Sequence, residues 1–239
     1  MPDALFDISV IIPAKNEEKR IPRFLDSLIS YCQKSRLRYQ LIVVDDGSSD
    51  KTAEIIINYK KSFPQLNLMS LGKNHGKGFA IKQGILSAKG RIVLFMDADG
   101  ATPADEIEKN LKYFEEGYDI VIGSSVMHQK DCSVKALLYR KTMGFIFNFL
   151  VRTLLIKGIK DTQCGFKMFR GEIVRPLWEK VRIEGFGVDL EVLFLAQKMN
   201  YKIKEVAVNW THVDESKINL VRDSLRMFHN IFQIRSWYG

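Results

Sequence analysis

The sequence has 239 residues, enough for one large domain with a substantial core, and its 46% hydrophobic and 27% charged residues are typical of a globular protein, which excludes a disordered chain. The net charge of +8 predicts an anionic partner, which could be nucleic acid, anionic lipid or a phosphorylated substrate. No zinc-finger spacing or run of RNA-binding aromatic residues favours nucleic acid. Three widely spaced cysteines, Cys32, Cys132 and Cys164, fit a reducing compartment and give no disulfide framework.

We expect neither a targeting segment nor a membrane-spanning segment in this sequence. No basic stretch precedes the first apolar run, so we expect no secretory signal. A spanning helix needs about 20 apolar residues. The best candidate, residues 143–156, is shorter and contains Asn148 and Arg152. Contact with a membrane surface stays open.

The first half of the chain alternates short apolar runs with segments of helical periodicity. Strands are expected at residues 8–12, 41–44, 66–71, 91–96 and 119–123. Helices are expected after Pro13, after a cap at Ser49 or Asp50, from Gly76, and from Thr102 with Pro103 as its first residue. This alternation predicts an α/β fold with a mostly parallel central sheet and helices on both faces.

The regular alternation of strands and helices ends after residue 123. We expect helices at about residues 133–157, 187–199 and 218–237, and a strand at residues 203–210. Since no internal repeat or low-complexity linker divides the chain, we expect a single domain over residues 1–239.

Polar segments follow three of the predicted strands, at residues 13–17, 45–48 and 97–99. In open α/β sheets, ligands bind beyond the carboxyl ends of the strands, so we expect the three segments to form one site. Asp97 and Asp99 are two residues apart and can share one side of a strand end. Such a pair attracts Mg²⁺, which commonly takes one or two carboxylates together with waters and phosphate oxygens. The alternative is a pair of surface turn carboxylates.

Two common nucleotide motifs are absent. Residues 72–78 contain Gly-Lys without the spacing of a phosphate loop, and residues 13–17 contain no glycine for a dinucleotide fingerprint. Residues 76–78 have two interpretations: a turn that begins a helix, or backbone amides and Lys77 beside a diphosphate.

Taken together, these segments resemble a known family. Residues 11–18, 43–48, 76–78 and 97–99 look like the signature of family-2 glycosyltransferases with the nucleotide-sugar-binding GT-A fold. Residues 158–169, 184–191 and 205–211, with Ser216 and Lys217, are similar to dolichyl-phosphate β-glucosyltransferases, to which dolichyl-phosphate mannose synthases are close relatives. The resemblance covers nearly the whole chain. It implies a nucleotide-sugar-binding half at residues 1–125 and an acceptor half with amphipathic helices at residues 126–239.

The resemblance also implies which residues bind the donor. They are Pro13, Ala14, Asn16, Glu17, Asp46, Lys77, Gly78, Asp97, Ala98 and Asp99. Within this set, Asp46 would contact the uracil or guanine edge, and Asp97 and Asp99 would hold Mg²⁺ or Mn²⁺ against the diphosphate. For Asp45 we favour a turn or helix-capping carboxylate.

For the acceptor, the resemblance implies a lipid phosphate. Its second pKa of about 6 makes it largely dianionic at neutral pH, so it needs cations and no general base. Arg140 matches a family arginine that binds lipid phosphate, and Lys167 and Gln163 are further candidates; either cation could instead be a solvated surface charge. Direct displacement at the anomeric carbon would invert its configuration.

The catalytic residues expected from this resemblance are Asp99, Arg140 and Asp189. With a sugar hydroxyl as acceptor, Asp189 or Glu191 could be a general base. We favour a supporting role in which Asp189 positions the donor or Lys167. Ser125 stands where relatives usually carry an arginine, which leaves the exact acceptor open. Ala101 stands where mannose synthases often carry glutamine, which favours a glucosyl donor.

The last predicted helix has an apolar stripe at Ile218, Val221, Leu225, Phe228 and Phe232, with Arg222, Arg226 and His229 on another face. This pattern predicts either a helix that rests in a membrane surface or one that packs on the sheet. The four histidines have no metal-ligand spacing.

The sequence therefore predicts an inverting, metal-dependent enzyme that moves glucose from UDP-glucose to a polyisoprenyl phosphate at the cytoplasmic face of a membrane, without nucleic acid. The alternatives are GDP-mannose or another nucleotide sugar or acceptor, and a non-catalytic nucleotide-sugar-binding relative. A nucleotidyltransferase would carry a Gly-rich loop with Lys or Arg after the first strand, and that loop is missing.

Overall fold

A computed structural model describes residues 5–125, 151, 154–211 and 220–239. Its centre is a seven-stranded sheet in the order β3-β2-β1-β4-β6-β5-β7. The strands are β1 (Phe6–Ala14), β2 (Tyr39–Asp45), β3 (Leu66–Ser70), β4 (Gly90–Met96), β5 (Ile120–Ser124), β6 (Phe166–Arg170) and β7 (Ile203–Ala207). Only β6 among them is antiparallel to its neighbours, so the predicted mostly parallel sheet is confirmed.

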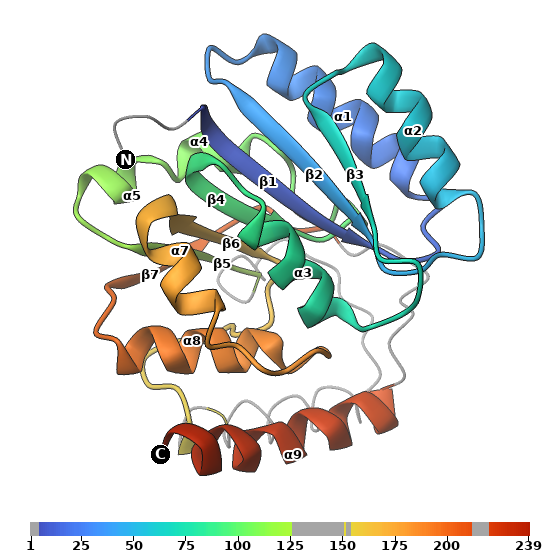
Figure 1. The fold of residues 1–239 in the computed structure, drawn as a ribbon. Helices are drawn as coiled ribbons and strands as arrows, with labels where there is room; N and C mark the ends of the chain where they lie inside the picture. Colours follow the sequence, from blue (N-terminus) through green and yellow to red (C-terminus); the bar gives the residue numbers. More distant parts are fainter. Residues whose placement is uncertain (1–4, 126–150, 152–153, 212–219) are drawn as a thin grey trace.

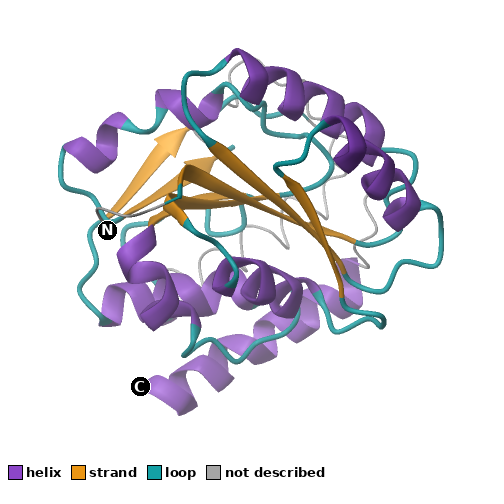
Figure 2. Ribbon diagram, turned by 45° about the horizontal axis from the view of Figure 1, so that its top comes forward, coloured by secondary structure: helices purple, strands orange, loops and turns teal. Residues whose placement is uncertain are grey.

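Helices cover both faces of this sheet, as the alternating pattern predicted (Figures 1 and 2). They are α1 (Ile21–Lys34), α2 (Thr52–Ser62), α3 (Lys77–Leu86), α4 (Glu106–Lys109), α5 (Lys112–Glu115), α7 (Gly171–Trp178), α8 (Val188–Lys198) and α9 (Leu220–Tyr238). Along β1, Val10 and Ile12 pack with α1, whereas Ile11 packs with α3 on the opposite face. Because the middle of β1 is buried on both faces, residues 10–12 are all apolar and do not alternate with polar residues.

Strand β6 and helix α7 were not predicted. Lys167 interrupts the apolar run in β6, and Arg170 ends it. Nevertheless, β6 pairs with both β4 and β5, and Phe166, Met168 and Phe169 are fully buried. Helix α7 begins at a glycine and contains Pro176, neither of which favours a helix in sequence analysis.

The helix predicted to begin at Thr102 instead begins at Glu106. The amides of Glu106 and Ile107 donate to the carbonyls of Pro103 and Ala104, three residues earlier. Tight turns of this kind replace the first α-helical turn. Thr102 is buried and does not cap α4, so the predicted boundary was wrong.

Two other boundaries need correction. The predicted strand at residues 203–210 ends at Ala207. Most of the helix predicted at residues 133–157 lies outside the described residues; Val151 and Leu154 are helical, and the helix has ended before Lys157.

Helix α9 forms the outermost layer on the side of α8 (Figure 1). Ile231 and Ile234 are fully buried against the core, whereas Phe228 and Phe232, from the predicted apolar stripe, are 40% and 51% exposed. The helix therefore packs on the protein through a face adjacent to that stripe. The side chains of Ile218, Val221 and Leu225 lie outside the described residues. None of the described helices has the length and hydropathy needed to cross a bilayer.

Candidate active site

A cavity of about 1130 Å³ lies at the carboxyl ends of β1, β2 and β4. The predicted donor residues that line it are Pro13, Ala14, Asn16, Glu17, Asp46, Lys77, Asp97, Ala98 and Asp99, and Gln163 and Asp189 line it as well. Its opposite wall is formed by residues 182–187 and one side of α9. The structure thus brings three separate strand-end segments into one site, while what each residue binds stays a prediction.

The segment after β1 is fixed by polar side chains from the segment after β2. The amide of Asn16 donates to Ser48 Oγ at 2.8 Å, and Asn16 Oδ1 accepts the amide of Ser49 at 2.8 Å. Asn16 has a φ of 54°, a left-handed conformation that asparagine tolerates better than most residues. Glu17 forms a two-point ion pair with Arg20, at 2.6 Å for both contacts. This segment therefore presents a pre-ordered wall to the cavity.

Asp46 connects the end of β2 to the start of α3. Its two carboxylate oxygens accept the amides of His75 and Gly76, at 2.7 and 2.8 Å. A carboxylate oxygen has a second lone pair, so Asp46 keeps acceptor capacity toward the cavity. Asp45 accepts the amide of Ser48 at 3.1 Å, which is the turn role that we favoured for it.

The structure corrects the donor role predicted for Gly78. Its amide donates to the carbonyl of Glu184 at 2.7 Å, so it is not available to a diphosphate. A Cβ on Gly78 would lie 2.4 Å from the carbonyl oxygen of Ile183. Gly78 is therefore a packing residue that lets residues 183–184 approach α3, and it does not line this cavity.

Asp97 and Asp99 face the cavity from the end of β4. Asp97 Oδ1 lies 2.7 Å from Lys77 Nζ, and Asp99 Oδ1 accepts the amide of Ala101 at 2.9 Å. Burial raises the pKa of Asp99, the amide of Ala101 opposes this, and the negative charge of Asp97 raises it further. Two carboxylates held this close repel each other, and a cation between them would relieve that repulsion.

This pair fits the predicted Mg²⁺ or Mn²⁺. In the described part of the chain, no group of three or more His, Cys, Asp or Glu side chains is arranged to hold a metal ion. Hard cations of this kind are commonly held by one or two carboxylates, with waters and phosphate oxygens as the remaining ligands. The ligand set therefore suits a cation that binds together with a diphosphate.

The structure also corrects the phosphate-binding role predicted for Lys167. This side chain is fully buried, and its ammonium donates to Asp189 Oδ1 and to the carbonyl of Cys164, each at 2.6 Å. It also lies 5.3 Å from the centre of the Phe95 ring. Lys167 does not line the cavity. Asp189 does, so the contact that we favoured, in which Asp189 supports Lys167, is present.

Glu191 has a structural role. Its carboxylate accepts the amides of Arg182 and Ile183, and Glu191 Oε1 accepts the hydroxyl of Tyr238 at 2.8 Å. It thereby attaches both the 182–184 segment and α9 to α8. It does not line the cavity, which leaves Asp189 as the member of this pair that faces it.

Gln163 and Ser125 are two described residues that the sequence analysis linked to the acceptor. The side-chain nitrogen Nε2 of Gln163 is buried and has no hydrogen-bond partner within the described residues, although Gln163 lines the cavity. An unmatched buried donor beside a cavity is a position for a ligand oxygen. Ser125 donates its amide and hydroxyl to Asp161, at 2.9 and 2.7 Å. Arg140 lies outside the described residues.

Sequence analysis did not assign several cations in the cavity wall. Arg20, Arg182 and Arg226 all line it. Arg226 reaches it because α9 approaches closely at Gly187, where a Cβ would lie 2.3 Å from Asn230 Oδ1. Gly187 is a sequence signal that could have indicated this contact.

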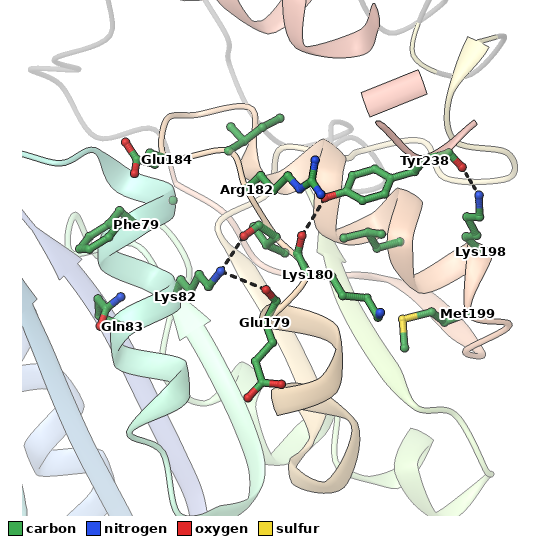
Figure 3. A pocket seen from close by; sticks show the side chains of 14 residues that line it. Phe79, Lys82, Gln83, Glu179, Lys180, Arg182, Glu184, Lys198, Met199 and Tyr238 are labelled. Atoms are coloured by element: carbon green, nitrogen blue, oxygen red, sulfur yellow. Dashed lines mark hydrogen bonds between the residues drawn. The ribbon is translucent and has the colours of Figure 1, made fainter. Parts of the chain in front are cut away.

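A second cavity, of about 850 Å³, shares residues 182–184 with the first as part of its lining (Figure 3). Lys82 points into this region and donates to the carbonyls of Val181 and Glu179, at 2.7 and 3.3 Å. This cavity lacks the Asp97 and Asp99 pair. We therefore assign the chemistry to the first cavity.

The fold is of the GT-A type, and comparison with known proteins identifies the family. The model described as Glycosyl transferase family 2 matches residues 9–178. The chain belongs to this family of glycosyltransferases.

Curated relatives cover almost the whole chain. Proteins named dolichyl-phosphate beta-glucosyltransferase from Dictyostelium discoideum, Homo sapiens and Saccharomyces cerevisiae are 40%, 36% and 33% identical to it. Each match spans 97% of this chain, and 74%, 75% and 75% of the respective relative.

Solved structures agree on the fold. A crystal structure of glucosyl-3-phosphoglycerate synthase from Mycobacterium tuberculosis in complex with Mn²⁺, UDP-glucose and phosphoglyceric acid matches with a TM-score of 0.70 and 20% identity. That match covers 97% of this chain and 80% of the other. The same enzyme in complex with Mg²⁺ and UDP matches with a TM-score of 0.67 and 21% identity, over 97% and 80% of the two chains.

The buried ion pair gives a first prediction. Lys167→Met leaves Asp189 as an uncompensated buried charge and should lower the free energy of unfolding by about 3–5 kcal/mol. Replacing both residues, with Lys167→Met and Asp189→Leu, should recover most of this loss. Urea unfolding of the two variants beside the parent checks this. A single variant as stable as the parent would contradict it.

Asp99 gives a second prediction, for metal-free protein. Because its folded pKa is raised, the ionised carboxylate destabilises the fold at neutral pH. This penalty decreases as the pH falls through the raised folded pKa, and it is gone below the unfolded value of about 3.9. Asp99→Asn should therefore raise the free energy of unfolding at neutral pH, and the gain should shrink in acid. Denaturant unfolding across this pH range measures it, and a gain that does not change with pH would count against it.

Proposed function

We propose that the protein transfers glucose from UDP-glucose to a polyisoprenyl phosphate with the help of Mg²⁺ or Mn²⁺. The observation that carries this proposal is the carboxylate pair Asp97 and Asp99, which faces the same cavity as Glu17 and Asp46. The names of the curated relatives support the lipid phosphate and the glucosyl group. The ligands of the M. tuberculosis enzyme support UDP-glucose and the metal.

The donor would lie across the carboxyl edge of the sheet. Asn16, Glu17 and Asp46 would contact the base and ribose, and Asp97 and Asp99 would hold the cation. When bound, that cation would neutralise charge on the departing diphosphate. Lys77, beside Asp97, would add a positive charge at the same position.

The acceptor phosphate would approach from the side of Gln163. A dianionic phosphate is already a nucleophile, so this site needs groups that orient it and need not remove a proton. The unmatched Gln163 Nε2 can donate to a phosphate or sugar oxygen. We assign Arg140 to the phosphate from the family resemblance, and we assign Asp189, held by Lys167, to positioning at the anomeric carbon. Attack opposite the leaving diphosphate inverts the anomeric configuration.

We also propose that the protein works at a membrane surface, which we expect to be the cytoplasmic face. Phe228 and Phe232 are exposed on α9, and their rings pack edge to face with centres 5.3 Å apart. The same helix carries exposed Arg226 and Arg235. Aromatic and basic side chains on one helix are typical of contact with an anionic bilayer surface.

The transfer reaction gives a direct test. With Mn²⁺ and dolichyl phosphate, radiolabel from UDP-glucose should enter an organic-soluble product, more than label from GDP-mannose. Asp99→Ala should lower turnover by about 100-fold or more, because the cation would lose a ligand at the developing charge.

Arg140→Ala should raise the KM for lipid phosphate and leave UDP affinity unchanged. Label found only in water-soluble product would refute the lipid acceptor, and equal transfer from GDP-mannose would refute the donor.

The membrane proposal has its own test. Replacing Phe228 and Phe232 together by serine should weaken binding to anionic liposomes by about tenfold or more, since each half-exposed ring would lose apolar contact. Ile57→Ser is the matched control, because Ile57 is 50% exposed on α2, far from α9 (Figure 1). Flotation of the three proteins measures it. Equal flotation of the double variant and the parent would refute the role of α9.

A further inference from the structure

Lys77 neutralises the carboxylate that a metal ion would need. Its ammonium lies 2.7 Å from Asp97 Oδ1, and the Lys77 side chain is 16% exposed. On its other side, the ammonium lies 6.0 Å from the centre of the Phe186 ring. Lys77 therefore occupies one side of the Asp97 carboxylate.

Asp97 has little freedom to turn away from this contact. A Cβ on Gly165 would lie 2.0 Å from Asp97 Oδ2, so the backbone of residue 165 lies directly against the carboxylate. The amide of Asp97 also donates to the carbonyl of Gly165 at 3.2 Å. A divalent cation that binds Asp97 must therefore share this carboxylate with the ammonium, or displace it.

The backbone that carries Lys77 is fixed. The amides of its neighbours Gly76 and Gly78 donate to Asp46 and to the carbonyl of Glu184. Any displacement of the ammonium thus comes from rotation of the lysine side chain. A nucleotide diphosphate in the cavity would bring the negative charge that gives the ammonium a new partner.

We propose that Lys77 is a resident counter-ion of Asp97, which a divalent cation displaces efficiently only when a nucleoside diphosphate receives the ammonium. This inference rests on the proposed donor site. It makes cation binding and nucleotide binding depend on each other. Without the nucleotide, the cation would meet the Lys77 ammonium. Without the cation, the diphosphate would meet the carboxylate of Asp97. The lysine thereby suppresses binding of the cation alone.

The test measures Mn²⁺ affinity by electron paramagnetic resonance, with and without UDP. For the parent, UDP should tighten Mn²⁺ binding by a factor within the usual range for coupled sites, about 5–150-fold. Lys77→Met keeps a similar length without charge, and it should bind Mn²⁺ alone about tenfold more tightly than the parent. The UDP effect should shrink by about the same factor, which leaves the part that direct contact between the cation and the diphosphate supplies. Lys77→Arg keeps the charge and should behave as the parent does.

Lys82→Met is the matched control. It removes the same charge from the same helix, but Lys82 bonds to backbone carbonyls beside the second cavity (Figure 3). It should leave both Mn²⁺ affinities unchanged. Circular dichroism verifies that each variant is folded, and Lys77→Arg remains informative if Lys77→Met is not.

Two results would overturn the inference in distinguishable ways. In the first, the parent binds Mn²⁺ with UDP, but Lys77→Met does not bind Mn²⁺ alone more tightly than the parent, or Lys77→Arg does not behave as the parent does. The counter-ion role is then wrong and the donor site stands. If the parent binds neither UDP nor Mn²⁺, the donor site itself is wrong and the counter-ion role falls with it.

Discussion

The buried ion pair between Lys167 and Asp189 is the interaction on which the architecture of the site depends. Lys167 comes from β6 and Asp189 from the first turn of α8, so the pair joins the sheet to the helix that supports the far wall of the cavity. Both side chains are almost fully buried, and a charge in such a place is tolerated only when it is paired. Because Lys167 holds one oxygen of Asp189, the orientation of Asp189 in the cavity is set from behind.

Other acidic side chains act in the same way on the backbone. Asp46 binds the amides of the two residues that precede α3, Glu191 binds the amides of residues 182–183, and Asp161 binds Ser125. These carboxylates order the loops that surround the cavity. Asp97 and Asp99 line the cavity itself, and Asp46 lines it as well while it orders a loop. Among these acidic residues, Glu191 and Asp161 build the surroundings of the site, and Asp46, Asp97 and Asp99 also face its interior.

How much the sequence could predict depended on how local the signal was. The strands of the first half are buried on both faces, so apolar runs located β1, β2 and β4, and their polar ends located the site. Strand β6 was missed because Lys167 interrupts its apolar run, and the partner that makes this lysine a core residue is 22 positions away. Gly78 was assigned to a ligand because its real partner, the carbonyl of residue 184, is too distant in the sequence to be recognised from it.

The prediction for helix α9 was limited because its sequence did not show which face packs on the protein. The stripe at Phe228 and Phe232 and the residues Ile231 and Ile234 both have helical spacing, so either set could have faced the protein. The core accepts Ile231 and Ile234, and only the tertiary structure decides this. Arg140, the residue with the most specific acceptor role, lies outside the described residues and rests on the family resemblance.

The position of β6 has a consequence for how the chain folds during synthesis. β4 and β5 are made first, but they do not pair with each other, because β6 is inserted between them. Until the ribosome has released residues 166–170, β4 has an unsatisfied hydrogen-bonding edge beside Asp97, and such edges promote association between chains. Asp97 and Asp99 are thus synthesised early, but the strand that covers this edge of β4 is added only after residues 166–170 have been made.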